Sequence, residues 1–116
     1  MSGTNDAKEQ ARRGIADAAD ELIDVSRRIH ANPELAMEER QAAALLSERL
    51  EAHGFQVERN ACGLETAFRA SWGEGPVTIA YLCEYDALPE IGHACGHNLI
   101  ATAGLGAAYG LKAALS

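Results

Sequence analysis

Apolar residues near the start of the chain recur every three or four positions, which is the spacing of an amphipathic helix. Ile15, Leu22, Val25 and Ile29 follow this spacing, and Arg, Asp and Glu occupy many of the positions between them. The pattern predicts a helix over residues 6–30. We expect the helix to stop at the Ala-Asn-Pro sequence that follows, because proline disfavours a helical conformation in the residue before it.

Beyond this proline the pattern predicts a second helix and three strands. Residues 37–52 keep the helical spacing, and Gly54 provides a C-terminal cap. Residues 55–58 alternate between apolar and polar side chains, and residues 64–72 form another strand-like stretch that ends in Gly-Glu-Gly-Pro. Residues 77–83 are almost continuously apolar, which is typical of a strand buried on both faces of a sheet.

The last apolar stretch, residues 99–115, predicts a buried helix with Asn98 as its N-cap. Each glycine inside a helix costs roughly 1 kcal/mol, and we expect close packing of this helix on the sheet to compensate. The glycines concerned are Gly104, Gly106 and Gly110. The order α-α-β-β-β-α is that of part of an α/β sandwich in a single domain. Residues 84–97 then follow the most buried strand, where ligands of open α/β sheets usually bind.

Composition narrows the function classes without choosing among them. The chain is 47% hydrophobic and 23% charged, which is ordinary for a soluble globular protein. Its net charge of −7 and aromatic content of 5% argue against nucleic-acid binding. We expect neither a secretory leader nor a membrane span, and the three cysteines without a Cys-x-x-Cys pair favour the reducing cytoplasm.

The segment IGHACGHN, residues 91–98, concentrates the candidate chemistry. Cys95 and His97 could supply a thiolate and an imidazole to zinc from one tight turn. Glu84 and Asp86 in the preceding loop favour this interpretation. Two alternatives stay open: a buried thiol beside a helix-capping histidine, and a Cys/His nucleophile pair, for which the spacing of two residues is awkward.

The other histidines and cysteines have simpler interpretations. His93 could orient the loop, bind substrate or hydrogen-bond a backbone carbonyl, the last being the default. His30 and His53 fall at predicted helix ends, where a histidine complements the helix dipole. We expect Cys62 and Cys83 to be structural, one in a loop and the other closing a buried strand.

The segment EYDALPE (residues 84–90), followed by IGHACGHN, resembles the dizinc aminoacylase/carboxypeptidase family of metallopeptidases in its amidohydrolase branch. Within that branch it is most similar to p-aminobenzoyl-glutamate hydrolases and related cytosolic dipeptidases. The segment RIHANPEL (residues 28–35) also looks like the start of that family. The resemblance implies the N-terminal part of a three-layer α/β/α catalytic domain with a mixed sheet.

Carried over to this sequence, the resemblance makes Cys95 and His97 metal ligands and Asp86 the catalytic-site aspartate that supports the metal centre. Glu84 aligns where other branches carry a ligand histidine. Asn98 replaces an aspartate found in many amidohydrolases of the branch, as in the p-aminobenzoyl-glutamate-like members. The implied cofactor is a divalent metal, zinc first, with manganese or cobalt as the alternatives.

The resemblance further implies hydrolysis of the amide bond in small N-acyl amino acids or dipeptides by metal-activated water, in a homodimeric enzyme. The family's general-base glutamate, remaining ligands and lid domain lie downstream of the matched motifs, so we expect residues 1–116 alone to be inactive. The alternative is a non-catalytic module of the same fold that acts through binding or assembly.

Overall fold

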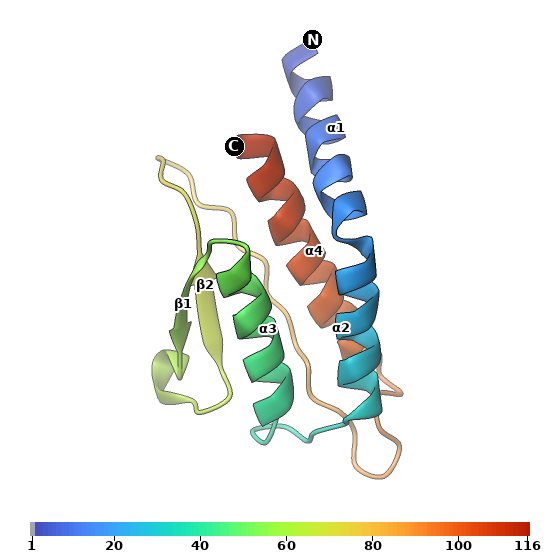
Figure 1. Cartoon of the computed structure of the whole chain (residues 1–116). Coiled ribbons are helices and arrows are strands. Elements are labelled where there is room, and N and C mark those ends of the chain that lie inside the picture. The colour runs from blue at the N-terminus through green and yellow to red at the C-terminus, as the bar shows by residue number, and fades with distance from the viewer. Residues whose placement is uncertain (1) are drawn as a thin grey trace.

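The computed structural model describes residues 2–116 as four helices, a short helical turn and a two-stranded sheet. Figure 1 shows α1 and α2 as one bent rod beside α4, with α3 and the sheet on the other side. In chain order the elements are α1 (Ser2–Asp17), α2 (Ala19–Ala31), α3 (Arg40–Ala52), β1 (Gln56–Arg59), η1 (Ala61–Gly63), β2 (Phe68–Ser71) and α4 (His97–Leu115).

The helix predicted over residues 6–30 is confirmed in type but is not continuous. It breaks at Ala18, whose φ of −98° and ψ of 10° lie outside the helical region. The Ala18 N–H donates to the carbonyl of Ile15 at 3.1 Å, a tighter turn than that of an α-helix. The second helix is also shorter than predicted: it begins at Arg40, because Met37 has a positive φ of 71° that an α-helix does not accommodate.

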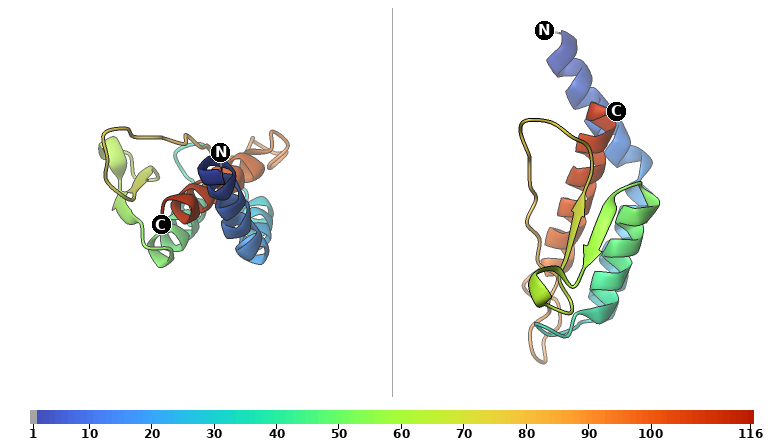
Figure 2. Two further views of the ribbon diagram at one scale, coloured as in Figure 1. Left: turned by 90° about the horizontal axis from the view of Figure 1, so that it is seen from above. Right: turned by 90° about the vertical axis from the view of Figure 1, so that its left-hand side faces the viewer.

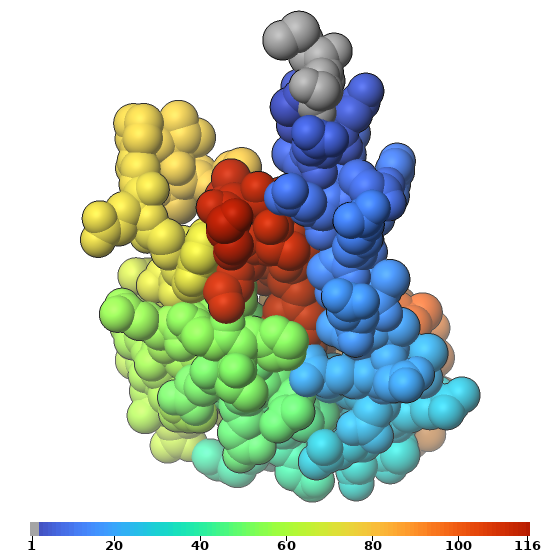
Figure 3. All heavy atoms as spheres, turned by 45° about the horizontal axis from the view of Figure 1, so that its top comes forward, coloured from blue at the N-terminus to red at the C-terminus, as the bar shows by residue number. Residues whose placement is uncertain are grey.

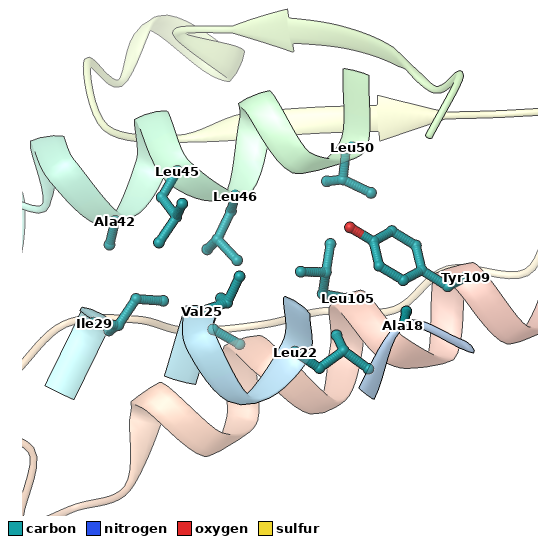
Figure 4. Packing of buried hydrophobic residues seen from close by; sticks show 11 residues of the cluster. Ala18, Leu22, Val25, Ile29, Ala42, Leu45, Leu46, Leu50, Leu105 and Tyr109 are labelled. Carbon is teal, nitrogen blue, oxygen red and sulfur yellow. The ribbon is translucent and has the colours of Figure 1, made fainter. Parts of the chain in front are cut away.

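The hydrophobic core lies where α2, α3 and α4 meet (Figure 4). The predicted apolar stripe of α2 supplies Leu22, Val25 and Ile29, and Val25 is fully buried. Helix α4 contributes Leu105 and Tyr109. The remaining buried members of the cluster are Ala18, Ala42, Leu45, Leu46, Leu50 and Ala101. Burial of such side chains, at about 25 cal/mol per Å² of apolar surface, is the main force that holds the helices together.

The two strands β1 and β2 pair antiparallel, from Gln56 opposite Ser71 to Arg59 opposite Phe68. The strand predicted from the alternation at residues 55–58 is therefore confirmed. Only the end of the stretch 64–72 is a strand, since a helical turn and a loop precede it. Val57, Phe68 and Ala70 pack against the core from this sheet.

The third predicted strand, residues 77–83, is wrong for this structure. The segment belongs to no strand of the described chain, and its side chains are exposed, with Val77 at 78% and Leu82 at 95%. Cys83 therefore does not close a buried strand. Figure 3 shows the yellow part of the chain, which leads into this segment, standing away from the helices. No helix in residues 2–116 is long and apolar enough to cross a membrane.

The glycines of α4 do pack closely, but against helices and a loop rather than against the sheet. A Cβ on Gly106 would lie 3.3 Å from Leu22 of α2, and one on Gly110 would lie 2.9 Å from Ile15 of α1. Gly104 faces the sulfur of Cys83. The prediction of compensation by packing is confirmed, and its location is corrected.

Gly14 of α1 provides a test of this helix contact, because a Cβ there would lie 2.6 Å from the Cβ of Ala113 in α4. Gly14→Ala should lower the free energy of unfolding by about 1–3 kcal/mol through overpacking, although alanine has the higher helix propensity. Urea unfolding measures the change. Gly3→Ala is the control, since its Cβ would meet nothing within 4 Å. Equal stability of the two variants would contradict the close contact.

A polar cluster links α2, α3 and α4 at the edge of the core, and sequence reasoning missed it. His53, predicted only to complement a helix dipole, does follow α3, but its Nε2 also lies 3.0 Å from Oε2 of Glu21. Its ring stacks on Tyr109, with the centroids 3.7 Å apart. Arg49 approaches Glu21 at 3.4 Å, and the Lys112 ammonium donates to the carbonyl of His53.

Glu21 should make stability depend on pH. Burial raises its pKa, but the Tyr109 hydroxyl, the His53 imidazole and the Arg49 charge together lower it below 4.5. A carboxyl group with a depressed folded-state pKa stabilises the fold above its unfolded pKa and loses that contribution as the pH falls through the folded value. The free energy of unfolding should therefore fall below about pH 4.5. In Glu21→Gln that decrease should be smaller, and an identical pH profile would contradict the assignment.

Candidate metal centre

The loop between residues 84 and 97 is attached to the rest of the fold at Ala87. The Ala87 N–H donates to the carbonyl of Glu34 at 2.7 Å, and Leu35 and Ala87 form an isolated parallel bridge. The chain then folds back, since the Leu88 N–H donates to the carbonyl of Gly92 at 2.9 Å. The RIHANPEL and DALP segments, far apart in the sequence, are thus in direct contact.

Tyr85 anchors the acidic part of this loop from the other side. Its hydroxyl donates to the carbonyl of Thr66, and its ring lies parallel to Phe68 of β2 with centroids 6.0 Å apart. Burial, with a smaller effect of the Glu39 carboxylate, raises the pKa of Tyr85 to about 12. The hydroxyl therefore remains a donor at neutral pH, and its two neighbours, Glu84 and Asp86, start from a fixed position.

The Cys-Gly-His turn leads directly into α4. Gly96 has a left-handed φ of 82° and precedes the helix, and its carbonyl accepts the N–H groups of Leu99 and Ile100. A glycine adopts this conformation without the steric cost that a side chain would add. The turn places His97 at the first position of α4.

Asn98 does not cap this helix, so that prediction is wrong. Its side chain is buried, and Nδ2 donates to the hydroxyl of Ser26 in α2 at 3.2 Å. Because Gly96 occupies the cap position, Asn98 lies inside the helix and faces α2. It therefore fixes the start of α4 against its neighbour.

His97 contacts the three other residues that the sequence singled out. Its Nδ1 lies 2.9 Å from Oδ1 of Asp86, and its Nε2 lies 3.3 Å from Oε2 of Glu84 and 3.5 Å from Sγ of Cys95. Cys95 is exposed and His97 is half-buried. The convergence predicted for these four side chains is therefore present.

The contact with Asp86 determines which face of the imidazole can bind a cation. An ionised carboxylate only accepts hydrogen bonds, so Nδ1 carries the hydrogen of a neutral His97. The lone pair on Nε2 then faces a carboxylate oxygen and a sulfur. Three electron-rich atoms in this arrangement favour a cation between them.

The two alternatives from the sequence have different outcomes. Cys95 is exposed and the His97 side chain makes no capping hydrogen bond, which excludes a buried thiol beside a capping histidine. The Cys/His pair is less awkward than its spacing suggested, because Sγ and Nε2 are within hydrogen-bonding reach. Among residues 2–116, no three His, Cys, Asp or Glu side chains form a group that could hold a metal ion.

His93 is buried beside this site. Neither of its ring nitrogens has a hydrogen-bond partner in the described chain, so the expected bond to a backbone carbonyl is absent. Its ring centroid lies 6.3 Å from that of His30. Burial lowers the pKa of His93, and the neighbouring His30 and His97 lower it further.

Sequence reasoning also missed Glu34, whose side chain caps α3. Its two carboxylate oxygens accept the backbone N–H groups of Gln41 and Ala42, each at 2.9 Å. A carboxylate at a helix N-terminus also interacts favourably with the helix dipole. Because the Glu34 carbonyl holds Ala87, one residue joins the start of α3 to the loop that carries Asp86. An acidic residue several positions before a helical pattern gives little local signal of this role.

Removal of this cap should destabilise the fold. Glu34→Ala leaves the N–H groups of Gln41 and Ala42 without their acceptor, and should lower the free energy of unfolding by about 1 kcal/mol in urea titrations. Glu38→Ala is the matched control, because Glu38 is exposed in the same connection. Indistinguishable midpoints for the two variants would refute the capping role.

No protein-family model matches the chain. Among curated relatives, the Xaa-Arg dipeptidase of Mus musculus is 47% identical over 93% of this chain, and that of Homo sapiens is 44% identical over 87%. One of the subunits of the p-aminobenzoyl-glutamate hydrolase of Escherichia coli is 38% identical over 93%. The chain spans only 24–27% of the length of these relatives.

The matches confirm the resemblance inferred from the two motifs. The alignments cover most of the chain rather than one short segment, and further relatives are carboxypeptidases and an N-acetyl-L-cysteine deacetylase. On this evidence the chain belongs to the aminoacylase/carboxypeptidase family of metallopeptidases, peptidase family M-twenty.

Proposed function

We propose that this chain contributes to a metal-dependent amidohydrolase and that Cys95 and His97 are two of its metal ligands. The supporting observation is the approach of Sγ and Nε2 to 3.5 Å, with Asp86 on the opposite nitrogen of the imidazole. Thiolate sulfur and imidazole nitrogen are the donors that zinc prefers, so the residues fit a divalent metal as a partial ligand set.

Asp86 acts through His97 in this proposal. By accepting the Nδ1 hydrogen it fixes the tautomer and the ring orientation and makes Nε2 a better donor. A divalent metal bound here supplies Lewis acidity toward an amide carbonyl and lowers the pKa of a nearby water molecule. Glu84, on the Nε2 side of the ring, completes the negative surroundings of the cation.

The substrate is proposed from the relatives. Their names describe the cleavage of an Xaa-Arg dipeptide and of p-aminobenzoyl-glutamate, both of which contain an amide bond to an amino acid. We therefore propose that the whole protein hydrolyses dipeptides or small N-acyl amino acids, as a cytoplasmic homodimer with zinc, manganese or cobalt. In it, these residues would form part of a three-layer α/β/α catalytic domain.

Cobalt provides a direct test of ligation, because a Co²⁺–thiolate bond gives a charge-transfer absorption band in the near ultraviolet. Titration of the 116-residue chain with Co²⁺ should produce this band, and Cys95→Ser should abolish it. His97→Ala should weaken binding strongly. Asp86→Ala should raise the apparent dissociation constant roughly 10- to 100-fold, as expected for the loss of a carboxylate that orients a histidine ligand.

Cys62→Ser is the matched control, since Cys62 is also an exposed free thiol but lies in the η1 turn. It should leave the band unchanged. A band that survives Cys95→Ser, or that is lost in Cys62→Ser, would contradict the assignment of the ligand.

A further inference from the structure

The segment from Pro76 to Cys83 is an extended strand without a partner. Among the described residues, no backbone–backbone hydrogen bond involves positions 72–86. The segment runs along the outer edge of the molecule in the view from above (Figure 2), apart from the paired strands β1 and β2. Unpaired N–H and C=O groups along an apolar strand are a template for pairing with another strand.

The side chains are those of a strand and not of a solvated loop. The segment reads PVTIAYLC and contains no charged residue. Val77, Ile79 and Leu82 are more than half exposed, at 78%, 59% and 95%. Valine, isoleucine, threonine and tyrosine are favoured on a pleated surface, so each apolar side chain here gains by contact with a neighbouring strand.

We propose that the segment pairs antiparallel with the same segment of a second copy of this chain, with Ala80 at the twofold axis. In this register Thr78 lies opposite Leu82 of the partner, and Ile79 lies opposite its Tyr81. Both copies contribute the same surface, as a twofold interface requires. Each copy then gains an aromatic–β-branched pair, one of the favourable cross-strand combinations.

Charge selects the antiparallel direction. Glu74 precedes the segment and Glu84 follows it, so each end carries a carboxylate. Parallel, in-register pairing would put each carboxylate beside its copy, and like charges directly opposite are destabilising. In the antiparallel register Glu84 lies opposite Pro76, and the Glu84 side chains are at opposite ends of the paired region. A partner without this symmetry has no such constraint.

Sedimentation equilibrium of the 116-residue chain in a buffer with chelator tests the proposal without reference to metal. Wild type should approach twice 12.3 kDa as its concentration rises. Thr78→Lys combined with Leu82→Lys places two ammonium groups opposite each other in both pairs, and should raise the dimer dissociation constant about tenfold. Both residues are exposed in the monomer, so the fold should persist, as circular dichroism can verify.

A charge reversal tests the register. Thr78→Lys combined with Leu82→Glu places opposite charges together in the antiparallel pairing and should restore the dimer, whereas parallel pairing would oppose like charges and would not. Ile23→Lys combined with Leu64→Lys is the control for added charge, because both residues are exposed apolar side chains elsewhere, and it should dimerise like wild type. Three results would overturn the proposal: a monomeric wild type, association that ignores the lysine pair, and failure of the reversal to restore the dimer.

Discussion

The close approach of α4 to α1 and α2 is the contact on which the other features depend. It requires glycine where the helices meet: Gly106 faces Leu22, and Gly110 faces Ile15. Without these contacts the bent rod of α1 and α2 would have no surface to pack against. Because His97 is the first residue of α4, the same packing determines where the imidazole lies. The cost of glycine in a helix is offset here by apolar burial along two neighbouring helices.

The candidate site is fixed from three directions. Helix α4 holds His97, and Asn98 ties this end of the helix to Ser26 of α2. Glu34 holds Ala87 while its carboxylate caps α3. Tyr85 attaches the acidic loop to the sheet side through Thr66. Such multiple attachment gives a loop the rigidity that a preorganised ligand set needs. It also explains why conspicuous motifs that are far apart in the sequence belong to one structural unit.

Much of this could be predicted from the sequence, where the signal is local. Helical spacing identified Leu22, Val25 and Ile29 as one buried stripe, and alternation identified β1. The Cys-Gly-His turn and the acidic loop predicted the convergence of Cys95, His97, Asp86 and Glu84. The failures concern long-range contacts. Asn98 is a good N-cap by type, yet Ser26 on another helix is its partner. Nothing near His53 in the sequence indicates Glu21, and nothing near Glu34 indicates Ala87.

Residues 77–83 show why a pattern can be correct about a residue's preferred environment and wrong about the structure. An apolar, β-branched segment indicates that its most favourable state is a paired and covered strand. Residues 2–116 provide one side of that environment, since Cys83 lies against Gly104, and no neighbouring strand. The segment leads directly into Glu84, whose carboxylate approaches His97. A strand that pairs with this segment would therefore also restrict the acidic loop, so the environment of the segment and the geometry of the candidate metal centre are physically coupled through one peptide bond.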